Sequence, residues 1–240
     1  MIPKIIHYIW LGKGEKPKIF QRCFDSWKKF CSDWQFMLWD ESNVDLDCCE
    51  YVREAYDAKK YAFASDVIRF QKLYEYGGVY LDIDVELLKP IDDLLGEKCF
   101  MGFEAGPLLA PGLIIGTEKH NQDFQKILDD YYHDKFVIDG QLNIKTICVR
   151  CEEYYAKLGL EKKDKMQQLD TITIYSSEYF CPINTITNRK KITKNTYSIH
   201  WYYASWYSPK QRFKKNVKKT LNFLTFGLFG KILYKIRNKK

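Results

Sequence analysis

The chain has 240 residues, of which 46% are hydrophobic and 16% aromatic, and its formal net charge is +7. This composition excludes an intrinsically disordered chain and suffices for one substantial domain with a single core. The charge is uneven, because Glu178 is the last acidic residue and 15 of the 38 basic residues follow it. Residues 1–178 therefore carry 23 basic against 31 acidic groups, a net charge of −8, and the basic character belongs to the C-terminal part.

The first forty residues predict a strand, a helix and a second strand. Residues 4–10 read as a short buried strand that ends before two glycines, and residues 34–39 read as another strand. Between them, residues 19–30 carry apolar side chains at helical spacing. This rhythm predicts an α/β fold with a mixed, mostly parallel sheet flanked by helices.

A longer helix is expected to deliver the chain into a third strand. After a plausible helix at 47–59, a firmer one starts near Ser65, whose hydroxyl can cap it, and stops at Gly77. Asp66 and Arg69 lie three residues apart near its start, so they share one face. The apolar strand that follows leads directly to Asp82.

Asp82 and Asp84 form a D-x-D pair at the end of that strand. In an extended chain residues i and i+2 point to the same side, so both carboxylates can face one divalent cation. Carboxylate oxygens suit Mn²⁺ or Mg²⁺, which keep positions open for phosphate oxygens. The alternative is that both aspartates only cap a solvated turn before Pro90.

Further elements are expected up to about Pro209, which gives one domain over residues 1–208. The predicted strands cover 98–103 and 113–115, the predicted helices 122–133 and 142–157, and the β-like segments 172–175 and 196–201.

The remaining stretch, residues 209–240, combines eleven Lys and Arg residues with a Phe- and Leu-rich strip. Its apolar part is too short to span a bilayer, which needs about 20 residues. We predict a basic amphipathic helical tail that lies in an anionic membrane interface. The first residues lack the features of a secretory signal, so the expected location is the cytoplasmic face of a membrane, held peripherally.

Three ordered motifs resemble glycosyltransferase family 32, the DXD-motif sugar transferases that include capsule and lipopolysaccharide enzymes, and are similar to the catalytic domain of large clostridial glucosylating toxins. The motifs are IPKIIHYIWLG at 2–12, ASDVIRFQKLYEYGGVYLDID at 64–84 and NTYSIHWYYASW at 195–206. The resemblance implies a GT-A-type, Rossmann-like fold and retention of anomeric configuration without an obvious protein nucleophile.

The resemblance also implies roles for individual residues. It implies that Ile9 and Trp10 hold the nucleotide base, and that Asp66 and Arg69 contact the donor sugar and its phosphate. Tyr80 would lie beside the nucleotide, Asp82 would touch ribose, sugar or metal-bound water, and Asp84 would bind the metal directly. Ser205 and Trp206 would close over the diphosphate. A body of net charge −8 can accept a diphosphate only where a cation, Arg69 and backbone N–H groups converge.

The sequence leaves the roles of several single residues undecided. Trp10 serves equally well as core filler, and His7 is expected to be a satisfied interior histidine. His200 could contact phosphate, neighbour the metal or belong to the core, and we favour the phosphate contact. Glu104 could reach the reacting sugar, although an exposed loop glutamate is the commoner explanation.

The expected function is metal-dependent, retaining transfer of a hexose or N-acetylhexosamine from a nucleotide diphosphate sugar to a surface glycan or lipid-linked acceptor, with catalytic Asp82, Asp84 and Arg69 and no nucleic-acid partner. UDP-linked donors are preferred, and GDP-mannose is the alternative. A haloacid-dehalogenase-type phosphatase would use the same D-x-D with a further acidic pair, but Asp129 and Asp130 fall in a helical pattern. A non-catalytic basic membrane adaptor would rest on the tail alone.

Overall fold

The computed structural model describes residues 1–104, 107–184 and 189–203. The predicted tail at 209–240, and Ser205 and Trp206, lie outside these residues. The helices are α1 (Lys18–Phe30), α2 (Glu50–Asp57), α3 (Tyr61–Tyr76), α4 (Gln122–Tyr132), α5 (Ile147–Ala156) and α6 (Ser177–Phe180), with a 3₁₀ turn η1 at Asp92–Leu94. The strands are β1 (Ile5–Ile9), β2 (Gln35–Trp39), β3 (Gly78–Tyr80), β4 (Val85–Leu87), β5 (Cys99–Glu104), β6 (Leu108–Leu109), β7 (Ile115–Thr117), β8 (Val137–Ile138), β9 (Gln141–Leu142), β10 (Gln167–Gln168), β11 (Thr173–Tyr175) and β12 (Ser198–His200).

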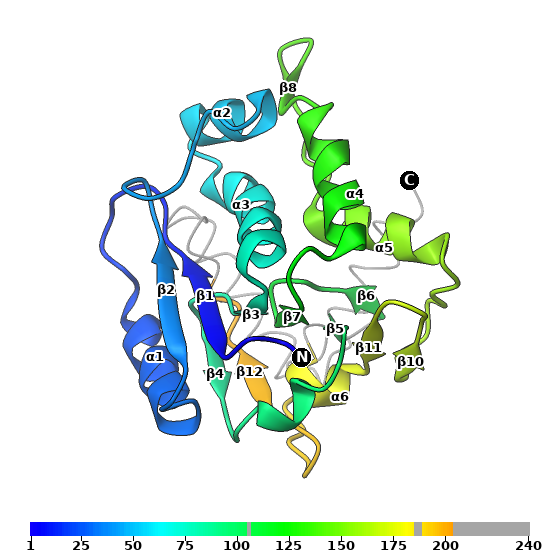
Figure 1. The fold of residues 1–240 in the computed structure, drawn as a ribbon. Helices are drawn as coiled ribbons and strands as arrows, with labels where there is room; N and C mark the ends of the chain where they lie inside the picture. The colour runs from blue at the N-terminus through cyan, green and yellow to red at the C-terminus, as the bar shows by residue number, and fades with distance from the viewer. Residues whose placement is uncertain (105–106, 185–188, 204–240) are drawn as a thin grey trace.

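The central sheet has the order β10-β11-β5-β7-β3-β1-β2, and β6 pairs with the outer part of β5. Strands β1, β2, β3, β5 and β11 run in one direction, whereas β6, β7 and β10 run in the other. Figure 1 shows this sheet crossing the molecule from β2 to β10. The mixed, mostly parallel sheet that the sequence predicts is therefore confirmed.

Two apolar clusters cover the two faces of the sheet. One lies under α2, α3, α4 and α5 and contains Val67, Met101 and Phe124. The other lies under α1, β4 and α6 and contains Trp27 and Phe180. Successive residues of a strand face opposite sides, so β5 sends Met101 to the first cluster and Phe100 to the second. The fold thus has three layers.

Two glycines let α3 turn directly into the centre of the sheet. Gly77 and Gly78 have φ of 63° and 101°, a region that side-chain-bearing residues rarely adopt. A Cβ on Gly78 would lie 2.8 Å from the carbonyl oxygen of Ile5 in the neighbouring strand. The glycine pair therefore permits both the change of direction and the close approach of β3 to β1.

Two predicted helix starts are wrong. Helix α3 begins at Tyr61, four residues before Ser65, and the Ser65 hydroxyl donates to the carbonyl of Ala62 at 2.8 Å instead of capping. The ring of Phe63 packs 5.1 Å from that of Phe136, a tertiary contact that supports the extra turn. Helix α5 begins at Ile147, because residues 137–142 form the β8–β9 hairpin.

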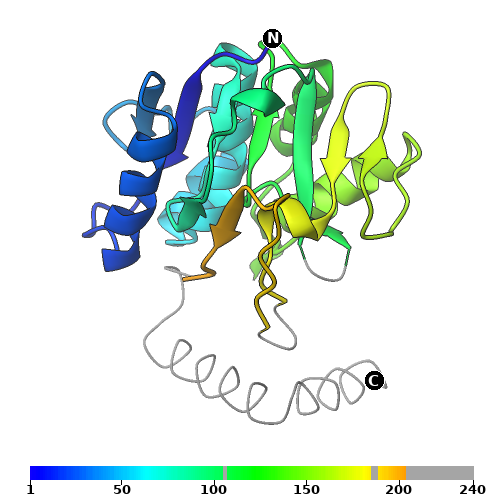
Figure 2. The same ribbon diagram turned by 90° about the horizontal axis from the view of Figure 1, so that it is seen from below.

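A small second sheet brings the end of the described chain to the central one. Strand β12 pairs antiparallel with β4, and His200 lies opposite Val85. Figure 2 shows β12 (orange) beside β4 and next to α6 (yellow). This pairing places residues 198–203 against the loop that follows β3.

Candidate active site

The D-x-D pair lies in a tight turn between β3 and β4. Strand β3 ends at Tyr80, and the backbone N–H of Val85 donates to the carbonyl of Asp82 at 3.0 Å, which closes the turn. The extended geometry expected for Asp82 and Asp84 is therefore wrong. The turn nevertheless brings their carboxylates to the same place.

His200 completes a group of three side chains that could hold a metal ion. One ligand atom each from Asp82, Asp84 and His200 lies within 4.8 Å of the other two. His200 Nε2 is 3.0 Å from Asp84 Oδ1 and 3.8 Å from Asp82 Oδ2. The other oxygen of Asp84 accepts a hydrogen bond from the backbone N–H of Tyr203 at 2.7 Å, which fixes the carboxylate.

The two closest members of this group support each other's charge. Burial alone would raise the pKa of Asp84, but the charge and hydrogen bond of His200 outweigh it, so that pKa is lowered. Burial alone would lower the pKa of His200, and Asp84 reverses the effect, so that pKa is raised. The other ring nitrogen, Nδ1, is buried without a partner among the described residues.

The donor set fits a hard divalent cation. Two carboxylates suit Mn²⁺ or Mg²⁺, and an imidazole nitrogen favours the softer Mn²⁺ of the two. His200 Nε2 already faces both aspartates, so the ring is oriented for ligation without a change of element. The fixed position of Asp84 against the Tyr203 N–H is the kind of outer contact that orients metal ligands.

A second polar cluster surrounds Arg69 and shares Asp82 with the first. Arg69 Nη2 lies 3.3 Å from Asp66 Oδ1 and 3.2 Å from Asp82 Oδ1. Its guanidinium stacks 4.3 Å from the centre of the Tyr80 ring, and the Tyr80 hydroxyl donates to Asp82 at 2.8 Å. The structure thus brings together Asp66, Arg69, Tyr80 and Asp82, four of the residues that the resemblance places around the donor.

Burial sets the protonation of this cluster. It raises the pKa of Asp66 to about 7, although Arg69 opposes the shift. Burial also works against the charge of Arg69, but Tyr80, Asp82 and Asp66 together hold its pKa above the usual range. Asp66 is therefore a carboxyl that can accept or donate a hydrogen bond near neutral pH.

The backbone of Gly112 lies close to the carboxylate of Asp82. A Cβ there would lie 2.6 Å from Asp82 Oδ2 and 3.7 Å from Arg69 Nη1. Gly112 belongs to the loop that leads into β7. The absent side chain lets this loop pass directly over the shared aspartate.

The predicted base-binding residues end the strand next to β3. Tyr80 pairs in register with His7, so Ile9 lies about level with Asp82. The Ile9 side chain is buried in the first apolar cluster, which leaves its backbone as the part that can meet a ligand. Trp10 is half-buried, and its indole N–H donates to the carbonyl of Gly14 at 2.6 Å.

His7 is confirmed as a satisfied interior histidine. Its Nε2 lies 2.8 Å from the carbonyl of Gly77, and its Nδ1 accepts from the indole N–H of Trp39 at 3.1 Å. Both ring nitrogens are thus used, which assigns the proton to Nε2. Burial lowers the pKa of His7 to about 4, so the ring is neutral at pH 7.

Glu104 is not the exposed loop residue that the sequence favours. It ends β5, is partly buried, and accepts a hydrogen bond from the Tyr202 hydroxyl at 3.0 Å. The Tyr202 ring in turn lies 4.2 Å from the His200 ring. The sequence analysis assigned no role to Tyr202. The one feature that pointed to a role was that Tyr202 lies two residues after His200.

Residues 17–101 match the family model described as the glycosyltransferase sugar-binding region containing the DXD motif. Inositol phosphoceramide mannosyltransferase 1 of Schizosaccharomyces pombe is 30% identical over 56% of this chain and 45% of its own length. The chain thus spans less than half of that relative. Uncharacterized glycosyltransferase L373 of Acanthamoeba polyphaga mimivirus is 25% identical, with 86% of this chain and 84% of that protein covered.

Among solved structures, PaToxG Glycosyltransferase superposes with a TM-score of 0.50 at 20% identity, over 66% of this chain and 70% of that chain. This likeness concerns the fold alone, and it agrees with the predicted GT-A-type architecture. The comparisons support a general likeness to DXD-type glycosyltransferases, and the matched range, residues 17–101, contains Asp66, Arg69, Asp82 and Asp84.

Proposed function

We propose that the protein is a metal-dependent, retaining glycosyltransferase that moves a hexose or N-acetylhexosamine from a nucleotide diphosphate sugar to a glycan or lipid-linked acceptor. The observation that carries the proposal is the convergence of Asp82, Asp84 and His200 beside the buried Arg69 cluster. One group suits a cation, the other a phosphate and a sugar, and they share Asp82. A nucleotide diphosphate sugar supplies the phosphate and the sugar, and its diphosphate binds a divalent cation.

Each side chain then has a defined task. Asp84 and His200 would hold the ion, with the carboxylate of Asp84 oriented by the Tyr203 N–H. A bound ion would supply positive charge to neutralise the departing diphosphate. Arg69 supplies a fixed positive charge toward the phosphate, and Asp66 meets a hydroxyl of the sugar.

The donor is the finer part of the proposal. The Ile9–Trp10 and Asp66–Arg69 pattern favours a UDP-linked sugar, whereas relatives named as mannosyltransferases support GDP-mannose. Hydrolysis of a panel of UDP- and GDP-linked sugars, with Mn²⁺, Mg²⁺ or EDTA, decides between them. Absence of metal-stimulated hydrolysis with every donor would contradict the proposed function.

The acceptor and the membrane belong to the proposal as well. Relatives named for inositol phosphoceramide support a lipid-linked acceptor, which suits a peripheral position at the cytoplasmic membrane face through the tail at 209–240. Within the described part of the chain, no helix combines the length and apolar composition needed to cross a membrane. Flotation of full-length and 1–208 protein with anionic vesicles tests the tail, and equal binding would count against it.

The acidic pair that the phosphatase alternative would use does not lie at the turn that holds Asp82 and Asp84. Asp129 and Asp130 lie on α4, and Asp130 pairs with Arg150 at 3.1 Å. The group of Asp82, Asp84 and His200 is the only three-residue set of potential metal ligands found among the described residues. These observations favour sugar transfer over phosphate hydrolysis.

A further inference from the structure

Glu104 is a carboxylate at the same edge of the sheet as Asp82, and the proposed function gives it no task. Strands β5 and β3 run in the same direction, because each pairs antiparallel with β7. Met101 of β5 and Tyr80 of β3 both pair with Ile115 of β7. Glu104 follows Met101 by three residues and is the last residue of β5, and Asp82 follows Tyr80 by two, so both carboxylates lie toward the same end of the sheet.

The separation of the two strands suits a substrate between them. β7 lies between β3 and β5, which puts these strands about 10 Å apart at two strand spacings. Paired carboxylates on either side of a glycosidic bond are separated by about 5 to 9.5 Å in sugar-cleaving enzymes. The loop that leads into β7 reaches this edge with Gly112, so at that position no side chain stands beside Asp82.

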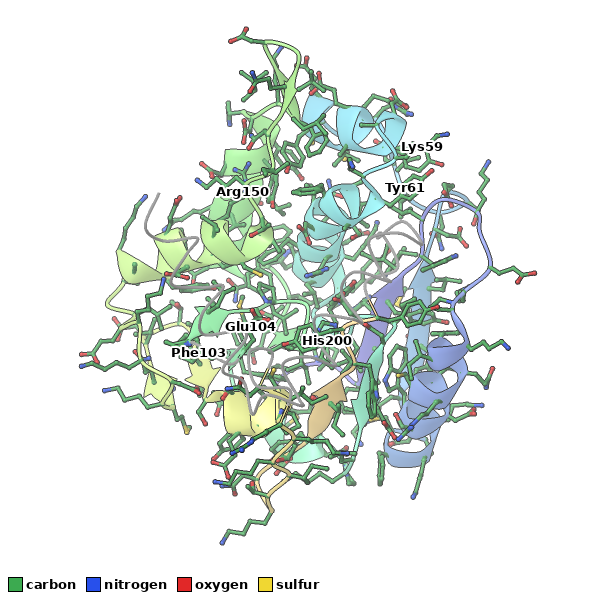
Figure 3. The ribbon with its side chains drawn as sticks, turned by 180° about the vertical axis from the view of Figure 1, so that it is seen from behind. Lys59, Tyr61, Phe103, Glu104, Arg150 and His200 are labelled. Carbon is green, nitrogen blue, oxygen red and sulfur yellow. The ribbon has the colours of Figure 1, made fainter. Side chains whose placement is uncertain are left out.

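Tyr202 fixes Glu104 relative to the candidate metal ligands. Its hydroxyl donates to Glu104 Oε2, and its ring packs against His200. The backbone φ of Tyr202 is 51°, a left-handed conformation that a tyrosine rarely adopts and that often accompanies a functional constraint. Figure 3 shows Glu104 and His200 near each other, on the same part of the molecule.

Glu104 also keeps an acceptor atom available. Within the described ranges, Oε2 accepts from Tyr202 and no hydrogen bond to Oε1 is formed. A sugar hydroxyl is a donor that makes a strong, charge-assisted hydrogen bond with a carboxylate. A negative charge at this place also favours the positive charge that develops on a sugar ring during glycosyl transfer.

We propose that Glu104 is a substrate-binding residue that accepts a hydrogen bond from a hydroxyl of a reacting sugar through Oε1, and that Tyr202 is its positioning residue. The inference rests on the proposed glycosyltransferase function and adds a specificity-determining contact to it. The hydroxyl belongs either to the transferred sugar or to the acceptor. The chemistry of the contact is the same in both cases.

The test uses full-length Glu104→Gln protein, which keeps the size of the side chain and removes its charge. Donor hydrolysis in water and transfer to a panel of methyl hexosides are measured with Mn²⁺. If the transferred sugar supplies the hydroxyl, both rates fall by about 10-fold to 100-fold, the range expected for losing a charged hydrogen bond. If the acceptor supplies it, hydrolysis is retained and only transfer falls.

Calorimetry separates binding of the sugar from binding of the nucleotide. For a donor-sugar contact, Glu104→Gln weakens the sugar nucleotide and leaves the affinity for the free nucleotide diphosphate unchanged. Tyr202→Phe should reproduce the same selective loss to a smaller degree, since it frees Glu104 without removing it. A purely structural role would lower the melting temperature and both affinities together.

Glu97→Gln is the matched control. Glu97 precedes β5 at the opposite end of the strand and likewise accepts from a tyrosine hydroxyl, that of Tyr175 at 3.2 Å. Its substitution should leave hydrolysis and transfer unchanged. Unaltered hydrolysis, transfer and sugar nucleotide affinity in Glu104→Gln would overturn the inference while the proposed function stands. Wild-type protein that turns over no sugar nucleotide would overturn both.

Discussion

Arg69 and Arg150 are two arginines that the fold buries to nearly the same depth, with side-chain exposures of 5% and 3%. The guanidinium of Arg69 lies 4.3 Å from the Tyr80 ring, and that of Arg150 lies 4.2 Å from the Tyr131 ring. Each arginine also pairs with two aspartates, and each keeps its Nε without a partner among the described residues. The two clusters therefore share their chemical parts.

The surroundings of the aspartates separate the two clusters. Asp130, beside Arg150, is 63% exposed, whereas Asp66, beside Arg69, is 12% exposed. The other aspartate of each cluster, Asp134 or Asp82, is 25% or 22% exposed. Burial alone would raise the pKa of Asp134, but Arg150 and other donors lower it, whereas burial raises that of Asp66. A buried arginine by itself does not indicate a functional site. Buried carboxylates that lie beside a second group of potential ligands do indicate one.

The largest expected effect is on turnover by Asp84→Asn. The amide keeps the shape of the side chain and its contact with the Tyr203 N–H but removes the charge that would face the ion. We expect metal-dependent hydrolysis of the sugar nucleotide to fall by about 1000-fold, weaker Mn²⁺ binding in calorimetry, and an unchanged circular dichroism spectrum.

Asp134→Asn is the matched change in the other cluster and should leave the rate within about two-fold, as for a substitution away from the site. Unchanged turnover in Asp84→Asn, or equal losses in the two variants, would remove the distinction between the clusters.

Alanine in place of each arginine should lower stability in both variants, because each arginine is buried beside two aspartates, and should weaken binding in only one. Arg69→Ala should weaken the nucleotide diphosphate by about 100-fold, since it removes a charged contact to phosphate. Arg150→Ala should lower the free energy of unfolding by about 2 kcal/mol, because it removes a buried side chain that packs on Tyr131 and its charged hydrogen bonds to Asp130 and Asp134, and leave the affinity of the folded protein unchanged.

Titration calorimetry and urea denaturation measure these two quantities. The Arg69 cluster loses its proposed phosphate role if Arg69→Ala binds the nucleotide diphosphate as tightly as wild type.

His7 is a buried structural residue whose protonation should make the free energy of unfolding depend on pH. The pKa of about 4 in the folded state lies below the ordinary value of 6.5, so the unfolded chain binds the proton more readily. The contribution of neutral His7 is therefore complete above pH 6.5 and is lost as the pH falls toward 4, by up to about 3 kcal/mol.

His7→Gln should remove this acid dependence from urea denaturation curves. The comparison must be with wild type, because Asp66, whose pKa is raised to about 7, gives a slope of the opposite sign over the same range. Parallel pH profiles in the two proteins would contradict the assignment.

The smallest effect concerns the loop over Asp82. Gly112→Ala would place a methyl group 2.6 Å from Asp82 Oδ2, so the carboxylate or the loop must shift. We expect about a 10-fold loss of kcat/KM, which corresponds to about 1.4 kcal/mol, with little change in melting temperature. Gly14→Ala is the control, since a Cβ there meets nothing within 4 Å. Equal kcat/KM for the two variants would show that the close approach of Gly112 to Asp82 does not affect activity.

Local patterns in the sequence predicted much of the fold. The alternation and spacing of apolar residues gave β1, α1, β2 and the β11 segment within one or two residues. Gly77 marked the turn from α3 into β3, because only glycine tolerates that backbone there. Starts of helices were less well predicted, as Ser65 shows, because a packing contact made elsewhere in the chain extends α3 by a turn.

In the candidate site too, local patterns predicted some residues, and contacts between distant segments decided the others. Asp66, Arg69, Tyr80 and Asp82 come from one continuous motif, and a helix followed by a strand brings them together. His200 reaches Asp84 across 116 residues, and Tyr202 reaches Glu104 across 98. No local pattern encodes such pairs, so the sequence named His200 without its partner and misjudged Glu104.

The sequence by itself determined the order of the longer strands and helices, the glycine turn into β3 and the acidic pair that follows it, because these depend on neighbours within a few residues. It did not predict β4, β6, the β8–β9 hairpin, β10 or α6. The tertiary structure decided that His200 faces the pair and that Glu104 shares its edge. It also decided that Arg69, and not Arg150, is the buried charge beside potential metal ligands. These facts depend on which strands pair and which carboxylates lose their water, and both are properties of the packed chain.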